Sequence, residues 1–395
     1  MEERTVLHVD LNNFYASVEC KYKPELKEKY MAVCGSEDDR RGVVLAKNQL
    51  AKEKGVKTGM TKYEAKKICP EIIFVEAHHD RYELWSKKAK EIYSRYTDRI
   101  EPFGIDEAWL DVTHSKIFGS GEKIADEIRE VVKRELDLTV SVGVSFNKAF
   151  AKLGSDMKKP DGTTVISKEN FKEKVWKLPI GDLLYVGKHT AVKLKKIGVV
   201  TIGDLARTDY NYISSYLGKA GETLWRYANG EDDSPVTTET ESEEIKSVGN
   251  SVTCYRDLKD DEDASIMLTS LCESVAERLL KSNVGKATTL TLSIRDENLE
   301  WFSRQGKLKR PSVLSDDFYE KAFELLKKNV DWSKGIRSLG VAVSDFVNEE
   351  QLSFTDGDYE KKLALMKAVG KIKEKYGEEK VKKAVILKDK RLTKD

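Results

Sequence analysis

Three acidic residues stand at or near strand ends, and their type and placement suit them best for chemistry. Asp10 follows the apolar run 6–9. Asp106 and Glu107 are adjacent within a second strand-like segment, 105–112. If the two strands pair, the carboxylates converge at one sheet edge and repel one another. Two Mg²⁺ ions would relieve the repulsion and hold the attacking and leaving oxygens of a phosphoryl transfer. Acids at strand ends are also often solvated or cap helices, and spacing alone does not show that distant residues meet.

The elements that must carry these acids mix strands and helices over residues 1–165. Segment 139–144 alternates strictly, which predicts a third strand. Helical spacing predicts helices over 82–96, 124–136 and 147–157. This mixture predicts an α+β layer with helices on one face of a sheet.

The remaining segments differ in character. Residues 43–70 are mixed and Lys-rich, with glycines as breakers. The pattern is helical over 170–229, and 231–244 is acidic and rich in Thr and Ser, which is typical of an extended linker. A second, smaller α+β unit then follows as strand 247–255, helix 263–281, strand 288–295, a turn, helix 316–329 and strand 338–345. The tail from Tyr359 is predicted to be helical, with an apolar stripe of Leu363, Met366, Val369 and Ile372.

Length and composition set the outer limits. The 395 residues predict about two to four domains. Lys and Arg number 69 against 68 Asp and Glu, so the net charge of +1 excludes a globally basic nucleic-acid binder but not local basic patches. No apolar run approaches the roughly 18 residues of a membrane span. The five cysteines are scattered without a Cys-x-x-Cys pair, which favours reduced thiols in a cytoplasmic protein over a structural zinc site.

Four ordered blocks resemble one family. Residues 10–19, Asp-Leu-Asn-Asn-Phe-Tyr-Ala-Ser-Val-Glu, resemble the N-terminal motif of the Y-family translesion DNA polymerases, in the DinB or polymerase IV branch. Residues 104–111 resemble the family's acidic Ser-Ile-Asp-Glu-Ala signature, and 141–148 and 155–162 match two further blocks. The resemblance implies a right-hand polymerase that copies damaged templates with low fidelity and without proofreading.

The resemblance also implies a domain plan. It comprises a palm (1–18 and 75–167), small fingers (19–74), a helical thumb with a helix-hairpin-helix (168–232), a linker (233–245), an α+β little finger (246–347) and a C-terminal tail with helical character (348–395).

On this resemblance the catalytic residues are Asp10, Asp106 and Glu107. The same side chains and the backbone carbonyl of Leu11 would ligate two Mg²⁺ ions, for which Mn²⁺ could substitute. The ions would activate the primer 3′-hydroxyl and neutralise charge on the α-phosphate and the leaving pyrophosphate. Tyr15 falls at the family's steric gate, where a ring under the sugar leaves no room for a 2′-hydroxyl. Ordinary core packing is the alternative reading of this ring.

The resemblance further implies contacts to the deoxynucleoside triphosphate. Backbone N–H groups at the turn into a helix can bind phosphate oxygens, and a lysine suits a point contact. The family commonly has Tyr and Arg where this chain has Gln and Lys, so the grip keeps its polarity but changes its geometry. The implied contacts are Asn13, Phe14, Tyr15, Gln49, Lys52 and Lys159.

Three other positions depart from the family pattern. Asn12 replaces a common acid that is not a principal metal ligand, so catalysis should survive. Gly104 replaces the usual Ser, which removes a side chain near the catalytic strand. Ala46 lacks a hydroxyl found in some relatives.

The predicted DNA contacts lie in two regions. Gly187 and Lys188 open a hairpin whose backbone N–H groups could bind a phosphate, although a plain helix pair is equally compatible with the pattern. Four cations within seven residues predict phosphate contact by a little-finger strand, against the alternative of a solvated turn. These cations are Arg304, Lys307, Lys309 and Arg310.

Two short motifs are less specific. Gln351, Leu352 and Phe354 resemble the sliding-clamp-binding peptide of bacterial polymerases with one residue missing, and a flexible connector is the alternative. His78-His79-Asp80 has no further ligand pattern and is interpreted as a surface turn.

We therefore expect a monomeric, cytoplasmic enzyme that binds primer–template DNA and deoxynucleoside triphosphates, with the sliding clamp as a candidate partner and no membrane contact. A nucleotidyl cyclase would also use a palm-like sheet with two metals, but it would not explain the thumb-like and basic regions. A silent DNA-binding scaffold is the third hypothesis, and the retained acids argue against it.

Overall fold

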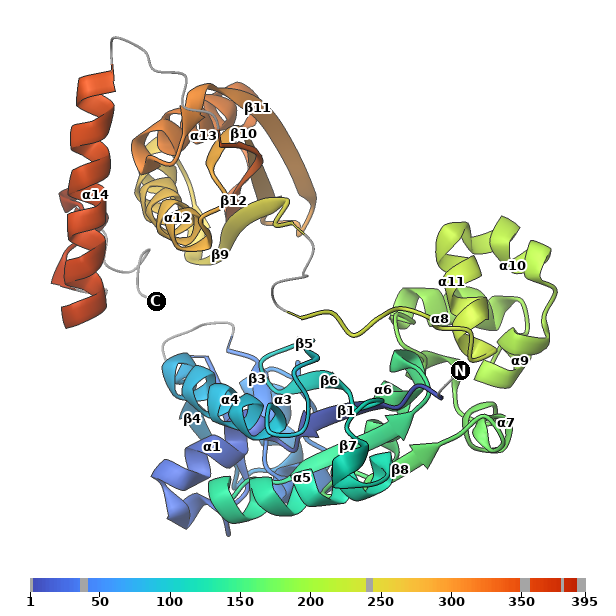
Figure 1. Cartoon of the computed structure of the whole chain (residues 1–395). Helices are drawn as coiled ribbons and strands as arrows, with labels where there is room; N and C mark the ends of the chain where they lie inside the picture. Colours follow the sequence, from blue (N-terminus) through green and yellow to red (C-terminus); the bar gives the residue numbers. More distant parts are fainter. Residues whose placement is uncertain (1–2, 36–41, 239–243, 349–355, 378–379, 389–395) are drawn as a thin grey trace. The chain divides into compact units, whose positions relative to one another are not determined.

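The computed structural model describes residues 3–35, 42–238, 244–348, 356–377 and 380–388. The chain forms two compact units, Met1–Ser242 and Glu243–Asp395, which are drawn together in Figure 1 and are described separately below.

A five-stranded sheet forms the centre of the first unit. Its order is β5-β6-β1-β7-β8, with β1 antiparallel to both neighbours and β7 parallel to β8. The predicted pairing of the two acid-bearing strands is confirmed, because Asp10 lies opposite Glu107. The strands are β1 (Val6–Leu11), β5 (Ile100–Pro102), β6 (Glu107–Asp111), β7 (Val140–Ser145) and β8 (Thr163–Ile166).

Helices cover both faces of this sheet, so the expectation of helices on one face is wrong. Leu7 and Val9 of β1 belong to a core that includes Ile128 of α5. The alternate residue His8 points the other way and bonds Ser155 of α6. The helices packed around this sheet are α1 (Phe14–Tyr22), α4 (His79–Tyr93), α5 (Gly121–Leu136) and α6 (Lys148–Met157).

A glycine lets α6 approach the sheet. A Cβ on Gly143 of β7 would stand 1.9 Å from the carbonyl oxygen of Ala151, so no side chain fits there. Asn147 caps the helix by accepting the N–H of Phe150 at 2.8 Å. Gly143 sets how closely α6 packs on the sheet, and Asn147 sets where the helix begins. Together they bring Lys152 of α6 close to Asp10 and Glu107.

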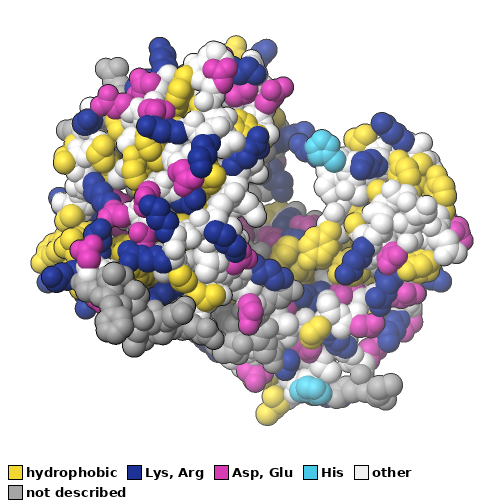
Figure 2. Space-filling view, turned by 90° about the horizontal axis from the view of Figure 1, so that it is seen from above, with side chains coloured by type: hydrophobic (Ala, Val, Ile, Leu, Met, Phe, Trp, Pro, Cys, Tyr) yellow, Lys and Arg dark blue, Asp and Glu magenta, His cyan; other side chains and the backbone are white. Residues whose placement is uncertain are grey.

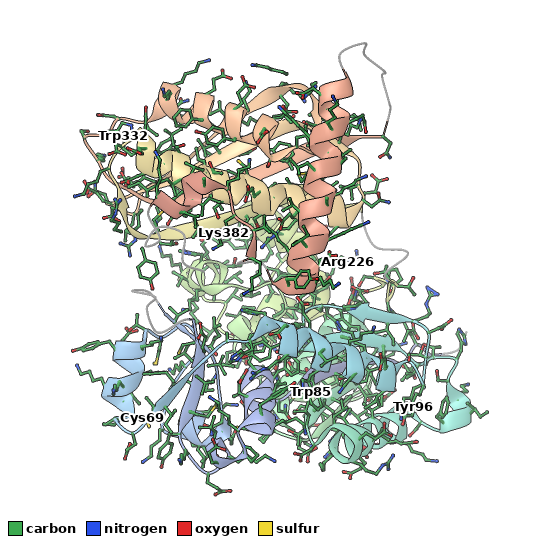
Figure 3. The ribbon with its side chains drawn as sticks, turned by 90° about the vertical axis from the view of Figure 1, so that its left-hand side faces the viewer. Cys69, Trp85, Tyr96, Arg226, Trp332 and Lys382 are labelled. Atoms are coloured by element: carbon green, nitrogen blue, oxygen red, sulfur yellow. The ribbon has the colours of Figure 1, made fainter. Side chains whose placement is uncertain are left out.

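A three-stranded sheet, which the sequence did not predict, occupies the segment 31–76. Its order is β3-β2-β4, and it carries its own small core of residues such as Val44, Val56 and Ala65. Cys69, labelled in Figure 3, directly follows α3, and all five cysteines are buried and form no disulfide. The elements are β2 (Met31–Cys34), β3 (Val44–Lys47), β4 (Ile73–Glu76), α2 (Gln49–Glu53), α3 (Lys62–Ile68) and the 3₁₀ turn η1 (Pro24–Leu26).

The helical character of 170–229 is confirmed, and residues 231–238 form neither helix nor strand. The elements after β6 that complete this unit are η2 (Lys116–Phe118), α7 (Phe171–Val175), η3 (Ile180–Asp182), α8 (Lys188–Lys196), α9 (Ile202–Arg207), α10 (Tyr210–Leu217) and α11 (Lys219–Ala228).

The second unit is an antiparallel four-stranded sheet of order β11-β10-β12-β9, with α12 and α13 packed on it (Figure 1). One edge strand, β11, occupies what the sequence pattern had left as a turn. Because most of its residues are polar and exposed, the sequence of β11 does not show the alternation of apolar and polar residues that predicts a strand. The elements are β9 (Ser247–Leu258), α12 (Asp261–Ser282), β10 (Lys286–Asp296), β11 (Trp301–Ser312), α13 (Ser315–Asn329) and β12 (Ile336–Val347).

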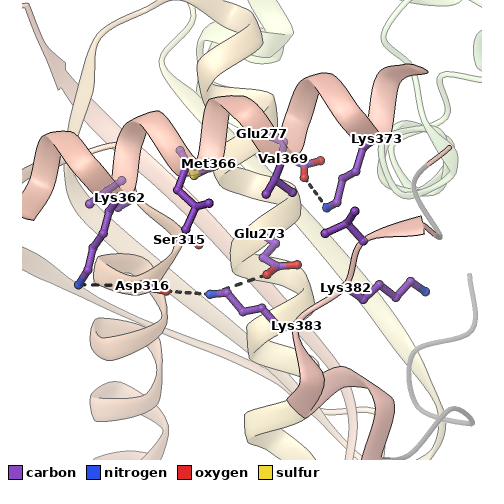
Figure 4. A pocket seen from close by; sticks show the side chains of 13 residues that line it. Glu273, Glu277, Ser315, Asp316, Lys362, Met366, Val369, Lys373, Lys382 and Lys383 are labelled. Atoms are coloured by element: carbon purple, nitrogen blue, oxygen red, sulfur yellow. Dashed lines mark hydrogen bonds and ion pairs between the residues drawn. The ribbon is translucent and has the colours of Figure 1, made fainter. Parts of the chain in front are cut away.

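The predicted helical tail is confirmed as α14 (Asp356–Tyr376), followed by η6 (Ala384–Lys388). Tyr359 is only 4% exposed and accepts the N–H of Val313 at 3.2 Å, which anchors α14 to this unit. A cavity of about 230 Å³ separates α14 from α12 and is crossed by the 2.6 Å pair of Lys373 and Glu277 (Figure 4). Ile372, expected in the apolar stripe, is 43% exposed.

The surface agrees with the near-neutral net charge. Figure 2 shows Lys and Arg interspersed with Asp and Glu on the face it presents. Across the part of the chain that the structure describes, no helix is both long and apolar enough to span a membrane.

Candidate active site

Strand pairing brings the three predicted acids together. Asp10 lies opposite Glu107, and the Leu11 N–H donates to the Asp106 carbonyl at 2.9 Å. Asp106 lies in a bend just before β6, so the alternation of strand side chains does not force it away from Glu107. Burial raises the pKa of Asp106, and the Asp10 carboxylate raises it further. Burial also raises the pKa of Glu107, while its bond to Lys152 opposes the rise.

Two lysines balance this negative charge in the structure. Lys152 of α6 pairs closely with Glu107, and its Nζ lies 3.7 Å from Asp10 Oδ2. Lys159 places its Nζ 2.8 Å from Asp10 Oδ2 and 2.8 Å from Asp156 Oδ1. Burial acts to lower the pKa of Lys159, but these carboxylates raise it above its ordinary value. Lys152 was not predicted from the sequence; its only signal is its place one turn before Asp156.

The donor set fits a hard divalent cation in kind. Carboxylate oxygens are the ligands that Mg²⁺ prefers, and Asp10, Asp106 and Glu107 offer them beside one another. Within the described ranges, no group of three or more His, Cys, Asp or Glu side chains is arranged as a ready metal site. In this arrangement the ammonium groups of Lys152 and Lys159 lie against the carboxylates of Glu107 and Asp10.

A buried histidine that sequence reasoning missed stands beside the acids. His8 is 0% exposed, with Nδ1 2.8 Å from Ser155 Oγ and Nε2 3.4 Å from Glu107 Oε2. The Ser155 hydroxyl donates to the Lys152 carbonyl, so it accepts from His8 Nδ1–H. Burial, with the charges of Lys152 and Lys159, lowers the pKa of His8. The His8 ring therefore lies between Ser155 of α6 and the Glu107 carboxylate.

A cavity of about 230 Å³ opens beside Asp10 and Asp106, and residues of both the five-stranded and the three-stranded sheet line it. All the predicted triphosphate contacts except Tyr15 line it. Its residues are Asp10, Leu11, Asn12, Asn13, Phe14, Leu45, Ala46, Lys47, Gln49, Lys52, Thr58, Asp106, Lys159 and Pro160.

Three ammonium groups line this cavity. Lys52 is exposed and Lys47 is half-buried, with its Nζ donating to Thr58 Oγ1 at 3.0 Å. Burial lowers the pKa of Lys47, and the nearby charges of Lys52 and Lys159 lower it further. Such a cluster suits a polyanion such as a triphosphate. Lys47 was missed because its strand, β3, was not predicted.

The start of α2 positions Gln49 and Lys52. Asn48 caps the helix by accepting the Ala51 N–H at 3.1 Å. Gln49 Nε2 donates to Glu53 at 3.0 Å, and Gln49 Oε1 is buried without a hydrogen-bond partner. An unpaired buried polar atom on the cavity wall is available to a bound group.

Two of the departures now have a structural setting. Asn12 is buried; it donates to Ser141 Oγ at 2.9 Å and accepts the Asp161 N–H at 2.8 Å, which ties β1 to the turn that carries Lys159. A Cβ on Gly104 would lie 3.4 Å from Asp106 Oδ1, so a serine there would contact a catalytic candidate.

Tyr15 lies just outside the cavity wall. Asn13, with a φ of 49°, turns the chain into α1, and asparagine tolerates this left-handed conformation. The half-buried Tyr15 ring stacks on Tyr82 with centroids 4.0 Å apart and planes 10° apart. Burial raises the pKa of Tyr15, and the Asp106 carboxylate adds to the rise.

The turn expected at His78-His79-Asp80 is instead the start of a helix, although His79 and Asp80 are exposed as expected. His78 is the residue before α4, and its Nδ1 lies 3.0 Å from the carboxylate of the buried Glu19. His79 begins α4 and places its ring edge-on to Tyr15 at 5.8 Å. This segment therefore packs behind the predicted gate.

The residues predicted to contact DNA are distant in sequence from the three acids. Gly187 caps α8 and Lys188 is its first residue. The four cations of β11 lie in the second unit and all have partners there. Arg304 bonds Asn329, Lys307 pairs with Asp345, Lys309 with Glu320 and Arg310 with Asp317. The candidate clamp residues Gln351, Leu352 and Phe354 lie outside the described residues.

Comparison with known proteins gives a consistent result. The impB/mucB/samB family model matches residues 9–156, and the model of that family's C-terminal domain matches 245–355. The chain is 50% identical to DNA polymerase IV of Acetivibrio thermocellus over 99% of each chain. It is 36% identical to DNA polymerase IV 1 of Bacillus subtilis, over 98% of this chain and 94% of that one.

Solved structures agree with these relatives. A Y-family DNA polymerase chimera of Dbh and Dpo4 is 27% identical, with a TM-score of 0.76 over 87% of this chain and 100% of its own. A Dbh ternary complex is 28% identical, with a TM-score of 0.61 over 87% of this chain and 99% of its own.

Proposed function

This chain belongs to the impB/mucB/samB family, the Y-family DNA polymerases of the DNA polymerase IV type, and we propose that it joins nucleotides at Asp10, Asp106 and Glu107. As a member it is a template-directed DNA polymerase of the low-fidelity, translesion kind. The observation that carries the proposed site is the convergence of three partly buried carboxylates beside a cavity lined by lysines. Family membership removes the cyclase and scaffold hypotheses.

Divalent-metal dependence is general in this family, and we assign the metal to the acids. Asp10, Asp106, Glu107 and the Leu11 carbonyl would hold two Mg²⁺ ions, for which Mn²⁺ could substitute. When bound, the ions would activate the primer 3′-hydroxyl and stabilise charge on the α-phosphate. The acids would hold these cations while Lys152 and Lys159 swing away from their present pairs with Glu107 and Asp10.

The cavity would hold the triphosphate of the incoming nucleotide. Lys47, Lys52 and Lys159 would neutralise its charge, and the first N–H groups of α1, at Asn13 to Tyr15, would bind its oxygens. The side-chain amide of Gln49, one N–H of which bonds Glu53, would donate its other N–H to a phosphate oxygen. Lys159 lines the cavity already, and it would exchange its present carboxylate partners for phosphate when substrate and metal bind.

Tyr15 would act as the gate against ribonucleotides. Its ring is packed from behind by Tyr82 and therefore cannot retreat to admit a 2′-hydroxyl. A gate must remain accessible to the sugar of the nucleotide, which explains why the Tyr15 ring is only half-buried.

We assign the palm to residues 1–18 and 75–167, the fingers to 19–74, the thumb to 168–232 and the little finger to 246–347. The five-stranded, three-stranded, helical and four-stranded parts support these assignments in turn. Small fingers would grip the new base pair loosely, and we expect no proofreading.

DNA contacts would come from two of these parts. The α8 turn of the thumb, at Gly187 and Lys188, and β11 of the little finger would bind the DNA backbone. Arg304, Lys307, Lys309 and Arg310 would exchange their present protein partners for phosphates. We further propose a cytoplasmic monomer, with Gln351, Leu352 and Phe354 as the contact to a sliding clamp.

The direct test is extension of a labelled primer on a template with an abasic site just ahead of it, with Mg²⁺. We expect insertion opposite the lesion, and no shortening of a mismatched primer when nucleotides are left out. Failure to extend even an undamaged template in Mg²⁺ or Mn²⁺ would contradict the proposal.

A further inference from the structure

A buried carboxylate lies under the predicted gate without any part in the proposed chemistry. Glu19 of α1 is 0% exposed, although carboxylates are rarely fully buried unless paired. Three groups from the start of α4 hold it. Tyr82 donates its hydroxyl at 2.8 Å, His78 Nδ1 lies at 3.0 Å and Arg81 Nη1 at 3.0 Å. We name Glu19, His78, Arg81 and Tyr82 the Glu19 cluster.

The Glu19 cluster fixes the ring that supports the gate. The Tyr82 hydroxyl both donates to Glu19 and accepts the His78 N–H at 3.1 Å, so its phenol end is held from two sides. The other end of Tyr82 stacks face to face on Tyr15. His79 stands edge-on to both rings, 5.7 Å from Tyr82 and 5.8 Å from Tyr15. If the Glu19 carboxylate moved, the Tyr82 ring would lose its fixed position, and the Tyr15 ring that stacks on it would be free to shift.

Stability alone does not explain a charge at this position. Removing a carboxylate from water is costly, and replacing a buried ion pair by apolar side chains is often neutral or stabilising. A buried charge with three partners does, however, select one orientation of its neighbours. Here the neighbour is the stack of Tyr82 on Tyr15, beside Asp106.

We propose that Glu19, together with His78 and Arg81, is a positioning group that locks the Tyr82–Tyr15 stack and thereby sets the discrimination between deoxyribonucleotides and ribonucleotides. This inference rests on the proposed role of Tyr15. The gate excludes a 2′-hydroxyl only if its ring cannot tilt, and the Glu19 cluster is what prevents tilting.

The experiment compares kcat/KM for a deoxynucleotide and the matching ribonucleotide on one primer–template. Glu19→Gln keeps the volume but loses the charge that holds Arg81, and Arg81→Ala removes one partner whose side chain is 28% exposed. We expect both variants to raise relative ribonucleotide insertion about three- to tenfold, as for a small misplacement of a positioning group. Tyr15→Ala should raise it further, and the Kd for DNA should stay within about twofold because phosphate contacts are untouched.

Arg95→Ala is the matched control, since it breaks a bidentate ion pair with Glu135 at 2.8 and 2.7 Å in the same unit but not behind the gate. An equal shift in Arg95→Ala would attribute the effect to general loosening and overturn the inference. A wild-type sugar ratio in Glu19→Gln and Arg81→Ala, with a raised ratio in Tyr15→Ala, would overturn the inference and leave the gate intact. An unchanged ratio in Tyr15→Ala would reject the gate itself. If Glu19→Gln fails to fold, Arg81→Ala decides alone.

Discussion

Asn12 joins the strand that carries Asp10 to the turn that carries Lys159. Its Nδ2 donates to Ser141, and its Oδ1 accepts the Asp161 N–H at 2.8 Å. The sequence showed only that an acid common in the family is missing at this position. The structure shows that the Oδ1 acceptor is the atom that holds the turn, because the Ser141 hydroxyl can also donate to Asn12 Oδ1, at 3.4 Å.

Replacing Asn12 should therefore affect nucleotide binding more than chemistry. In Asn12→Ala the turn loses its tie to β1, and we expect the KM for the deoxynucleotide to rise about three- to tenfold with a smaller change in kcat, since uniform binding is lost. Asn12→Asp keeps the acceptor for Asp161 and should stay near the wild-type KM. Steady-state primer extension checks both variants, and an equal loss in both would show that the Asp161 bond is not the cause.

The elements differ in how far the sequence predicted them. Strands β1, β6 and β7 were predicted because buried strands at the centre of a sheet are apolar or alternate strictly. Strands β2 and β3 were missed because each has four residues and little period. Strand β11 was implied only by the family resemblance, because its outward residues are mostly charged or polar and show no strand period.

The candidate site was also predicted only in part, because local sequence patterns reveal some of its residues and not others. Asp10, Asp106 and Glu107 are marked by strand ends and by the family resemblance. Lys152 reaches Glu107 only because α6 packs on the face of β1 that also carries His8, and that packing depends on a distant glycine. Local periodicity carries no signal for contacts between such distant segments.

Helix α12 offers a test of electrostatics in the second unit. Asp263, in its first turn, accepts Arg256 Nη1 and Nη2 at 2.5 and 2.6 Å. These bonds from Arg256, against a smaller effect of burial, lower the pKa of Asp263 below its ordinary 3.8. A lowered pKa in the folded state stabilises the fold above the unfolded value, and this contribution is lost as the pH falls through the folded value.

We therefore expect Asp263→Asn to lower the free energy of unfolding at pH 7 by about 1–2 kcal/mol, the worth of a partly exposed charged hydrogen bond. The difference from wild type should be constant from pH 5 to 7, since both lie above 3.8, and should shrink below about pH 4. Urea denaturation of residues 243–395 at each pH measures it. A difference that is equally large at pH 3 would show that shape, not charge, is responsible.

At the scale of the whole molecule, the two units carry separate cores, and we propose that they carry separate tasks. The acids and the cavity belong to Met1–Ser242, and the basic strand β11 belongs to Glu243–Asp395. Because the net charge is only +1, we propose that DNA affinity comes from local cations, those of β11 among them, and that it falls as salt rises.

Separating the units should separate these tasks. We expect residues 243–395 to melt cooperatively on their own, and residues 1–242 to keep weak primer extension. The affinity of residues 1–242 for DNA should fall at least about tenfold at physiological salt, because the phosphate contacts of β11 are gone. Thermal melting and DNA titration followed by fluorescence anisotropy check this. Unchanged affinity of residues 1–242 would assign DNA binding to the first unit alone.

The most direct test of the central claim is single-turnover primer extension by Asp106→Asn in Mg²⁺, beside a DNA-binding measurement. This change keeps the shape of the side chain and removes its charge, so we predict a loss of extension of at least about 10²-fold with DNA affinity unchanged. The variant Asp98→Asn, at an exposed position just before β5, should extend like wild type. Wild-type extension by Asp106→Asn would contradict the assignment of nucleotidyl transfer to these three acids.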